Sequence, residues 1–316
     1  MILVVMASLS FGARKIGFTD VITALFGTET DTLVSRIVKE RIPRTIFSIV
    51  AGSALAVSGA IMQTITRNPI SDPSILGVNT GASLAVVAGI AWFQINTYTQ
   101  YIFDAVIGAF VAAIFVYGIA SLGYGGITPV KLALSGAATS AALSSMVSAV
   151  MLPRTEVMNA FRFWQVGSVS GAEWEGMFLL FPIVFLAFLI VACMIPSLNM
   201  ISLGDETAKG LGVNVNLVRG VAAFAGVILC GSVTAIAGPI GFVGLMIPHI
   251  VRMLFGSDMK YMIPFSAAGG AILLTGSDVV GRMIGSPGEL EVGVVTALIG
   301  APVLIPIVRK SKGNVI

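Results

Sequence analysis

The sequence predicts an all-α, polytopic membrane protein with about ten transmembrane helices. Of its 316 residues, 56 % are hydrophobic and only 10 % are charged, whereas charged residues make up about 25 % of a soluble domain. Apolar runs approach the roughly 20 residues that a helix needs to cross a bilayer, and they recur along the whole chain. Since so few charges cannot cover a water-facing surface, the chain is expected to lie in a lipid bilayer.

The composition argues against several other functions. A net charge of +3 is too small to indicate nucleic-acid binding, and the G-x-x-x-x-G-K-S/T pattern that binds nucleotide phosphates does not occur. Cys193 and Cys230 lie in apolar runs without the spacing of metal ligands, so both are expected to be small core residues. We expect no metal site, no cofactor and no catalytic residue.

His249 is the single histidine, and it directly follows Pro248 in an apolar segment. A histidine inside a membrane is a functional candidate by default. Because the predicted spans contain no series of Asp, Glu and His residues, a proton relay has little support. A structural hydrogen bond from His249 to backbone groups freed by the proline is the favoured interpretation.

Ten apolar segments are candidate spans, and the first of them is short because charged residues follow it directly. They are residues 1–11, 46–65, 75–93, 101–122, 130–152, 177–195, 221–237, a segment that ends at residue 255, 262–282 and 293–308. Gly52 and Gly59 in the second segment suit closely packed helices in lipid. Pro43 fits the first turn of that helix, and Asp72 before Pro73 predicts an N-cap followed by a first helical position.

Residues 202–219 form a polar island in the apolar second half of the chain. Ser202 and Asp205 fit a capping box, so a helix is predicted to start there. Two glycines near residue 211 can end it, and Asn214 can cap a second short turn. Two short helices would form a rigid knob for a soluble partner, whereas a solvated loop is the alternative. The candidate contact residues are Leu203, Gly204, Asp205, Glu206, Ala208, Lys209, Gly210, Leu211 and Gly212.

The fifth segment is rich in small and hydroxyl-bearing residues between positions 135 and 148. Hydroxyl groups can face a wet cavity without carrying charge, so a pore wall explains this composition, and close helix packing explains it equally well. The spacings of four, one and four predict one shared helical face. The residues of that predicted face are Ser135, Thr139, Ser140 and Ser144.

The distribution of Lys and Arg does not settle the orientation. If residues 202–219 lie inside, nine basic residues fall on inner loops and nine on outer loops. Six of the outer nine precede the second span, namely Arg14, Lys15, Arg36, Lys39, Arg41 and Arg44. Without that loop the count is nine to three, so either the loop is positive for a functional reason or the first span is misassigned.

A series of spaced motifs runs from residue 41 to residue 302. They are Arg41-Ile-Pro-Arg44-Thr, Asn68-Pro69-x-x-Asp72-Pro73-x-x-Leu76-Gly77-x-x-x-Gly81-Ala82, Trp164-x-x-Gly167-Ser168, Leu203-Gly204-x-x-x-Ala208-x-x-Leu211-Gly212, Gly238-x-Ile240-Gly241-Phe242-x-Gly244-Leu245-x-x-Pro248-His249-x-x-Arg252 and Gly293-x-x-Thr296-x-x-x-Gly300-x-Pro302. Each motif alone is weak evidence. Together and in this order they resemble the permease family that imports ferric siderophores, haem and cobalamin.

The resemblance implies a type II ATP-binding cassette importer with a fold like that of the cobalamin-importer permease. One permease domain, residues 1–316, would lie in a bacterial cytoplasmic membrane and carry an iron-siderophore, haem or cobalamin-like chelate. It would pair with itself or a paralogue, bind two separate ATPase subunits inside and receive substrate from an extracytoplasmic binding protein. A secondary transporter and a structural membrane subunit without flux are the alternatives.

The resemblance also assigns roles within the polar island, which corresponds to cytoplasmic coupling helices. Because the chain lacks a nucleotide motif, conformational work must arrive through a contact of this kind. We expect Leu203 and Leu211 to anchor the ends of the helix on the membrane body. Glu206 and Lys209 are then left to face the ATPase, and a bulky residue at Ala208 should disturb the contact.

Two further roles follow from the same resemblance. Arg41, Arg44 and Arg282 correspond to sites that receive acidic residues of the binding protein, which would explain the positive outer loop. Substrate is expected to pass between two permease copies, with the hydroxyl-rich fifth span at the dimer axis.

Overall fold

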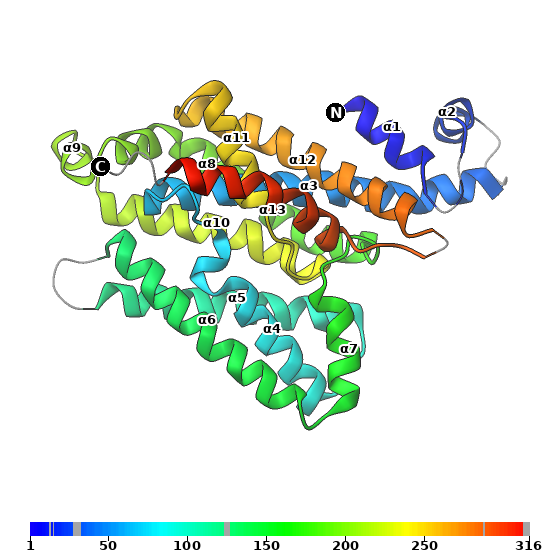
Figure 1. Ribbon diagram of the computed structural model, residues 1–316, viewed down its shortest axis with the longest axis horizontal. Coiled ribbons are helices and arrows are strands. Elements are labelled where there is room, and N and C mark those ends of the chain that lie inside the picture. Colours follow the sequence, from blue (N-terminus) through cyan, green and yellow to red (C-terminus); the bar gives the residue numbers. More distant parts are fainter. Residues whose placement is uncertain (13, 15, 28–32, 123–126, 287, 312–316) are drawn as a thin grey trace.

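A computed structural model describes residues 1–12, 14, 16–27, 33–122, 127–286 and 288–311, and these residues form helices joined by turns, without a strand (Figure 1). In chain order the elements are α1 (Ile2–Ser10), α2 (Phe18–Phe26), α3 (Leu33–Thr66), the 3₁₀-helix η1 (Pro73–Leu76), α4 (Val78–Ala88), the π-helix η2 (Gly89–Phe93), α5 (Tyr98–Ser121), α6 (Pro129–Met151), α7 (Thr155–Gln165), α8 (Trp174–Ser202), α9 (Asp205–Gly210), α10 (Val215–Ala237), α11 (Val243–Phe255), α12 (Met259–Ile284) and α13 (Val292–Ser311).

Six of the described helices are long and apolar enough to cross a membrane, namely α3, α5, α6, α8, α10 and α12. Three shorter apolar stretches, Val78–Phe93, Val243–Phe255 and Val292–Ile305, occupy three of the four other predicted spans. The prediction of an all-helical, multi-span membrane protein is confirmed. The number ten is approximate, because these three stretches are short and α1 has only nine residues.

The second predicted span belongs to a longer helix than the sequence suggested. Helix α3 has 34 residues and begins at Leu33, so Pro43 lies inside it and not in its first turn. A proline inside a helix removes one backbone hydrogen bond but does not have to end the helix. As a consequence, Arg41 and Arg44 project from a helix that continues into the membrane, and not from a loop.

Helix α3 is the centre of the fold and packs against α12, α10, α11 and α8. Small residues allow this close approach, as we predicted from Gly52 and Gly59 in the sequence. A Cβ atom on Gly59 would lie 1.9 Å from the carbonyl oxygen of Gly244 in α11, and one on Gly52 would lie 2.2 Å from that of Gly270 in α12. Helices α4, α5, α6 and α7 form a second group beside this bundle (Figure 1).

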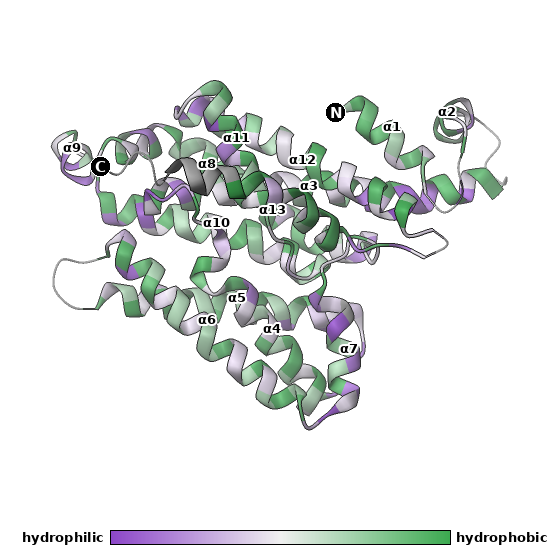
Figure 2. Ribbon diagram, viewed as in Figure 1, coloured by the Kyte–Doolittle hydropathy of each residue, from purple (hydrophilic) through white to green (hydrophobic). Residues whose placement is uncertain are grey.

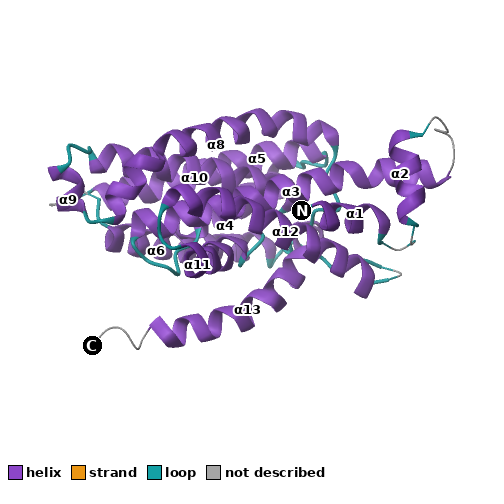
Figure 3. Cartoon of the chain, turned by 90° about the horizontal axis from the view of Figure 1, so that it is seen from above, coloured by secondary structure: helices purple, strands orange, loops and turns teal. Residues whose placement is uncertain are grey.

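The long axis of the molecule separates two polar ends. Helix α9 lies at one end, whereas α1, α2 and the start of α3 lie at the other (Figures 1 and 3). Hydrophilic residues gather at these ends and on α7, and the helices between them are mostly hydrophobic (Figure 2). Phe115, Phe178 and Phe185 are exposed on α5 and α8, as expected for side chains that face lipid.

The turn after α3 follows its sequence pattern. The Asp72 carboxylate accepts a hydrogen bond from the Ser74 backbone N–H at 2.9 Å, and Pro73 occupies the first position of η1. Gly77 then adopts φ 73° between η1 and α4, in the left-handed region that glycine enters without steric cost. The predicted N-cap at Asp72 is confirmed.

Candidate coupling and docking sites

The polar island contains one short helix, α9, and its cap differs from the prediction. Gly204 is the N-cap with φ 125°, and no side chain in the described structure caps the helix. Ser202 instead ends α8, where its hydroxyl donates to the Asn199 carbonyl at 2.6 Å. The capping-box prediction is therefore wrong, because the long preceding helix uses the serine for its own last turn.

The predicted second short turn is the beginning of a long helix. Asn214 does act as an N-cap, since its side-chain oxygen accepts from the Leu217 backbone N–H at 3.1 Å. The helix that it caps is the 23-residue α10. Between α9 and α10 the chain turns at Gly212, which has φ 83°, whereas Gly210 is still the last residue of α9.

Helix α9 contacts the membrane body through Ala208, and not through the flanking leucines as expected. Ala208 is fully buried and packs with Ile201 of α8 and Val215 of α10. Leu203 and Leu211 do not anchor the helix on the membrane body, because they are 66 % and 59 % exposed. Ala208 is the one buried residue of the six in α9, and the leucines that flank the helix are left exposed. Glu206 and Lys209 are also exposed, as expected.

Asp205 connects the start of α9 to the rest of the protein. Its carboxylate pairs with Arg67, which follows α3, and with Arg219 in α10. Arg67 also donates to the Ile201 carbonyl at 3.2 Å. Sequence reasoning treated Asp205 as a capping residue, and it missed both arginine partners because they are distant along the chain.

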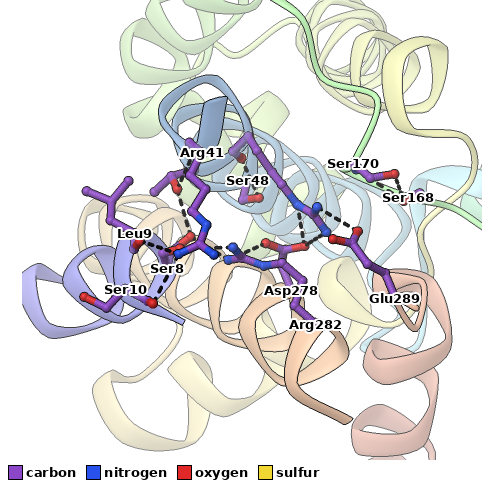
Figure 4. Close-up of polar contacts among 12 residues, drawn as sticks. Ser8, Leu9, Ser10, Arg41, Ser48, Ser168, Ser170, Asp278, Arg282 and Glu289 are labelled. Carbon is purple, nitrogen blue, oxygen red and sulfur yellow. Dashed lines mark hydrogen bonds and ion pairs between the residues drawn. The ribbon is translucent and has the colours of Figure 1, made fainter. Parts of the chain in front are cut away.

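The three arginines predicted to dock a binding protein converge at the opposite end. Arg41, Arg44 and Arg282 line one cavity of about 280 Å³ together with Glu40 and Glu289. Two of these arginines come from α3 and one from the end of α12. The structure therefore brings together residues that are about 240 positions apart in the chain (Figure 4). The end of the molecule with α1 and the start of α3 lies opposite α9 (Figure 1).

The guanidinium groups in this cavity already have partners. Arg41 donates to the carbonyls of Leu9, Ser10 and Arg14 at 2.7, 3.1 and 2.7 Å, so it holds the last turn of α1 against α3. Arg282 is 3 % exposed and donates to the backbone and the hydroxyl of Ser8 at 3.1 and 3.0 Å. These two arginines therefore fix α1 against the helices α3 and α12 that line the cavity.

Arg44 has acidic partners on both sides. Its Nε and Nη2 atoms bond to Asp278 at 3.0 and 2.7 Å, and its Nη1 atom bonds to Glu289 at 2.8 Å. Asp278 also lies 2.9 Å from Arg282, and it is buried. Sequence reasoning missed both carboxylates. An aspartate within the ninth span was a usable signal, because acids in spans usually pair and carry function.

The four hydroxyl residues of α6 do not share one face. Ser135 and Thr139 are buried, Ser140 is half-buried and Ser144 is exposed. Nine residues of an α-helix turn through about 900°, which places Ser144 opposite Ser135. The Ser135 hydroxyl donates within the protomer, to the Lys131 carbonyl at 2.7 Å, while Ser140 lies 3.4 Å from the Thr80 hydroxyl of α4.

A second, uncharged cavity lies along α6. It has a volume of about 210 Å³ and is lined by Thr80, Ser83, Ser144, Val147, Ser148, Met151 and Gln165. These residues come from α4, α6 and α7. The hydroxyl residues of α6 therefore serve both internal packing and the lining of this cavity. This is why the sequence could not separate a pore wall from close helix packing.

Two single-residue expectations need correction. The Nδ1 atom of His249 is buried and has no hydrogen-bond partner among the described residues, so the hydrogen bond expected after Pro248 is not observed. Cys230 is buried as expected, but Cys193 is exposed on α8. Within the described residues, no group of three His, Cys, Asp or Glu side chains lies in a position to hold a metal ion.

Comparisons with known proteins identify the class of this protein. A profile described as the FecCD transport family matches residues 1–310. The Bacillus subtilis (strain 168) Fe(3+)-citrate import system permease protein YfmD is 43 % identical over 308 residues, covering 96 % of this chain and 90 % of its own length. The Escherichia coli (strain K12) ferric enterobactin transport system permease protein FepD is 40 % identical, covering 97 % and 92 %.

A solved structure described as an inward-facing conformation of a metal-chelate type ABC transporter matches with a TM-score of 0.81 at 28 % identity, covering 98 % of this chain and 95 % of that one. The protein is accordingly a multi-pass permease of the cytoplasmic membrane and not an enzyme. A permease of this class works with a separate ATPase and a second permease subunit. The resemblance seen in the sequence motifs is confirmed, and the chain belongs to the FecCD transport family of ATP-binding cassette importers.

Proposed function

We propose that this protein moves a ferric chelate, such as an iron(III)-siderophore, iron(III)-citrate or haem, across the cytoplasmic membrane. In this proposal residues 1–316 form one permease domain, a separate ATPase supplies the energy and an extracytoplasmic binding protein delivers the chelate. The observation that carries it is the position of α9 and of the arginine cavity at opposite ends of one helix bundle. Each end thereby offers a contact surface to a different soluble partner. The relatives named for iron(III)-citrate and ferric enterobactin support the class of cargo.

The inner contact with the ATPase is made by residues 203–206 and 209–212. Leu203 and Leu211 project beside a charged, exposed helical face that contains Glu206 and Lys209. Large apolar side chains among charges at a membrane surface suit a groove in a soluble partner. Ala208 takes the opposite role, because it seats α9 on α8 and α10.

The outer contact with the binding protein centres on Arg44. Among the three cavity arginines, Arg41 and Arg282 both donate hydrogen bonds to α1, whereas Arg44 donates to the exposed carboxylate of Glu289. A carboxylate of the binding protein can therefore form a charge-assisted, bidentate bond with Arg44. Arg41 and Arg282 hold the shape of the cavity through their bonds to α1.

The translocation path runs between two permease copies along α6. Ser144 lines the uncharged cavity, and Ser140 lies beside Thr80, which also lines it. Ser135 and Thr139 pack the helix against its own protomer. An uncharged hydroxyl surface offers hydrogen bonds to the oxygen ligands of a chelate without binding it tightly. Selection of the chelate is then left largely to the binding protein.

Proteoliposomes that contain the permease and its ATPase test the function. Uptake of ⁵⁵Fe is measured with ferric citrate, ferric enterobactin and ferric hydroxamate, together with uptake of haem, with and without ATP. ATP-dependent uptake of at least one of these chelates is expected. Uptake by the permease alone under an ion gradient would indicate a secondary transporter. ATPase binding without flux of any chelate would indicate a structural subunit.

A further inference from the structure

Arg219 is a charged residue in the interior of the inner end. It lies near the start of α10 and is only 2 % exposed. Its guanidinium group donates to three separate parts of the chain. Nε bonds to the Ile65 carbonyl at 3.2 Å, Nη1 bonds to the Ile127 carbonyl at 3.1 Å, and Nη2 bonds to the two Asp205 carboxylate oxygens at 3.0 and 3.3 Å.

The partners of Arg219 mark three functionally different elements. Ile65 is in the last turn of the central helix α3. Ile127 directly precedes Thr128, which caps α6 by accepting a hydrogen bond from the Lys131 N–H. Asp205 is the first residue of α9. One side chain therefore joins the short inner helix to the beginning of the helix that lines the proposed path.

An apolar side chain at position 219 could not make these hydrogen bonds to three elements. Helix α9 packs on α8 and α10, whereas α6 packs on α4, α5 and η1, so the guanidinium group connects two groups of helices. A buried guanidinium is costly to desolvate, and Asp205, the one carboxylate that pairs with Arg219 in the described part of the chain, is shared with Arg67. The compensation is geometric, because the rigid fork of an arginine can hold several acceptors at fixed positions at once.

We propose that Arg219 is a positioning residue that transmits displacement of α9 to the inner end of α6. The inference rests on the proposed function, in which α9 contacts the ATPase. When the ATPase shifts α9, Asp205 moves with it, and Arg219 carries this movement to the backbone that precedes the α6 N-cap. Arg67 cannot do the same, since its described bonds reach only α8 and α9.

The response of α6 to nucleotide can be measured at Val130, which lies in the first turn of α6 and is exposed. The reporter protein carries Val130→Cys and Cys193→Ala, and it keeps Cys230, which is buried. The permease and its ATPase are reconstituted together in liposomes with the inner face outward. The rate of modification by a membrane-impermeant maleimide is then compared without nucleotide and with ATP and vanadate.

In the reporter background the labelling rate is expected to depend on nucleotide. Arg219→Lys keeps the charge but cannot hold three acceptors, and Arg219→Gln removes the charge. Both should reduce the nucleotide-dependent change by about five-fold or more, the lower end of a typical coupling between sites. Asp205→Asn cuts the link at the α9 end, where the side chain is partly exposed. Asp205→Asn should reduce the nucleotide-dependent change in the same way, and it provides the test if the Arg219 variants do not accumulate.

The control is Lys260→Gln, which removes one exposed positive charge at the start of α12, at the same end of the molecule. It should leave the labelling response unchanged. Co-purification with the ATPase is measured separately for every variant and tests α9 as the contact. Normal nucleotide responses in Arg219→Lys and Asp205→Asn would overturn the role of Arg219 while leaving the contact intact. If variants with substitutions at Leu203 and Leu211 still co-purify normally with the ATPase, the proposed contact between α9 and the ATPase is itself overturned.

Discussion

In the proposed docking at Arg44, Glu289 occupies the position that a carboxylate of the binding protein would take. Its side chain is 38 % exposed and lies 2.8 Å from Arg44, whose own side chain is 14 % exposed. If docking uses Arg44, the incoming carboxylate must displace Glu289. Glu289→Gln should therefore strengthen docking, because the permease no longer supplies a competing negative charge.

The size of this effect follows from the exposure of the pair. A partly exposed ion pair contributes about 0.5–1 kcal/mol, and removal of that competition corresponds to about a two- to five-fold lower Kd for the binding protein. The dissociation constant is measured with the permease in nanodiscs. The gain should shrink as salt rises, because screening weakens exposed charge pairs.

Glu291→Gln is the matched control. It makes the same charge change two residues away, and none of the ion pairs found among the described residues involves Glu291. If both variants strengthen docking equally, the effect is only the general field of the surface. An unchanged or higher Kd in Glu289→Gln would refute the competition between Glu289 and the binding protein. Arg44→Gln provides the reverse check, since it should weaken docking.

Three further changes test the packing and the inner contact. Gly59→Ala should lower the free energy of unfolding in detergent by an amount near the upper end of the about 1–3 kcal/mol typical of overpacking, because its Cβ would meet the α11 backbone, and the thermal unfolding midpoint should fall accordingly. Gly118→Ala, whose new Cβ would meet nothing within 4 Å beyond its chain neighbours and the nearby backbone of its own helix, should not lower the midpoint. The carboxyl group of Asp72 is enclosed although the residue keeps some exposed surface, and burial raises its pKa. Stability from this group is thus present at low pH and lost as the pH rises through the raised pKa. Asp72→Asn keeps a capping side chain and should match the wild type in acid and exceed it at higher pH in melting temperature, whereas Asp72→Ala should lose about 1 kcal/mol of capping. Ala208→Leu should push α9 off α8 and α10 and reduce co-purification with the ATPase, and Thr207→Leu on the exposed face of α9 should not shift α9.

Local sequence patterns predicted the helices and several of their ends. Apolar length located the spans, and short polar patterns located the caps at Asp72 and Asn214. The cap at Ser202 failed because the same residue can end one helix or begin the next. Local patterns do not decide which helix takes such a residue, since the choice depends on how far the apolar packing of α8 extends.

The sites were only partly readable from the sequence. The three arginines could be grouped through the family motifs, but their partners Asp278 and Glu289 could not, because these pairs are fixed by the packing of α3 against α12. The α6 hydroxyl residues were misjudged for a simpler reason. At about 100° per residue, the nine positions from Ser135 to Ser144 already place these two residues on opposite faces of α6. The neighbours of each residue then decide which hydroxyl is buried.

The two polar clusters share helix α3, although they lie at opposite ends of the molecule. Arg44 joins the outer part of α3 to Asp278 of α12, and Arg219 binds the Ile65 carbonyl in the last turn of the same helix. A helix of 34 residues is about 50 Å long, and glycine contacts with α11 and α12 hold it closely along this length. Since both clusters place costly charges against one rigid helix, neither can rearrange without changing what α3 contacts. A substitution such as Gly59→Ala is therefore expected to disturb the docking end and the coupling end together, even though it touches neither cluster.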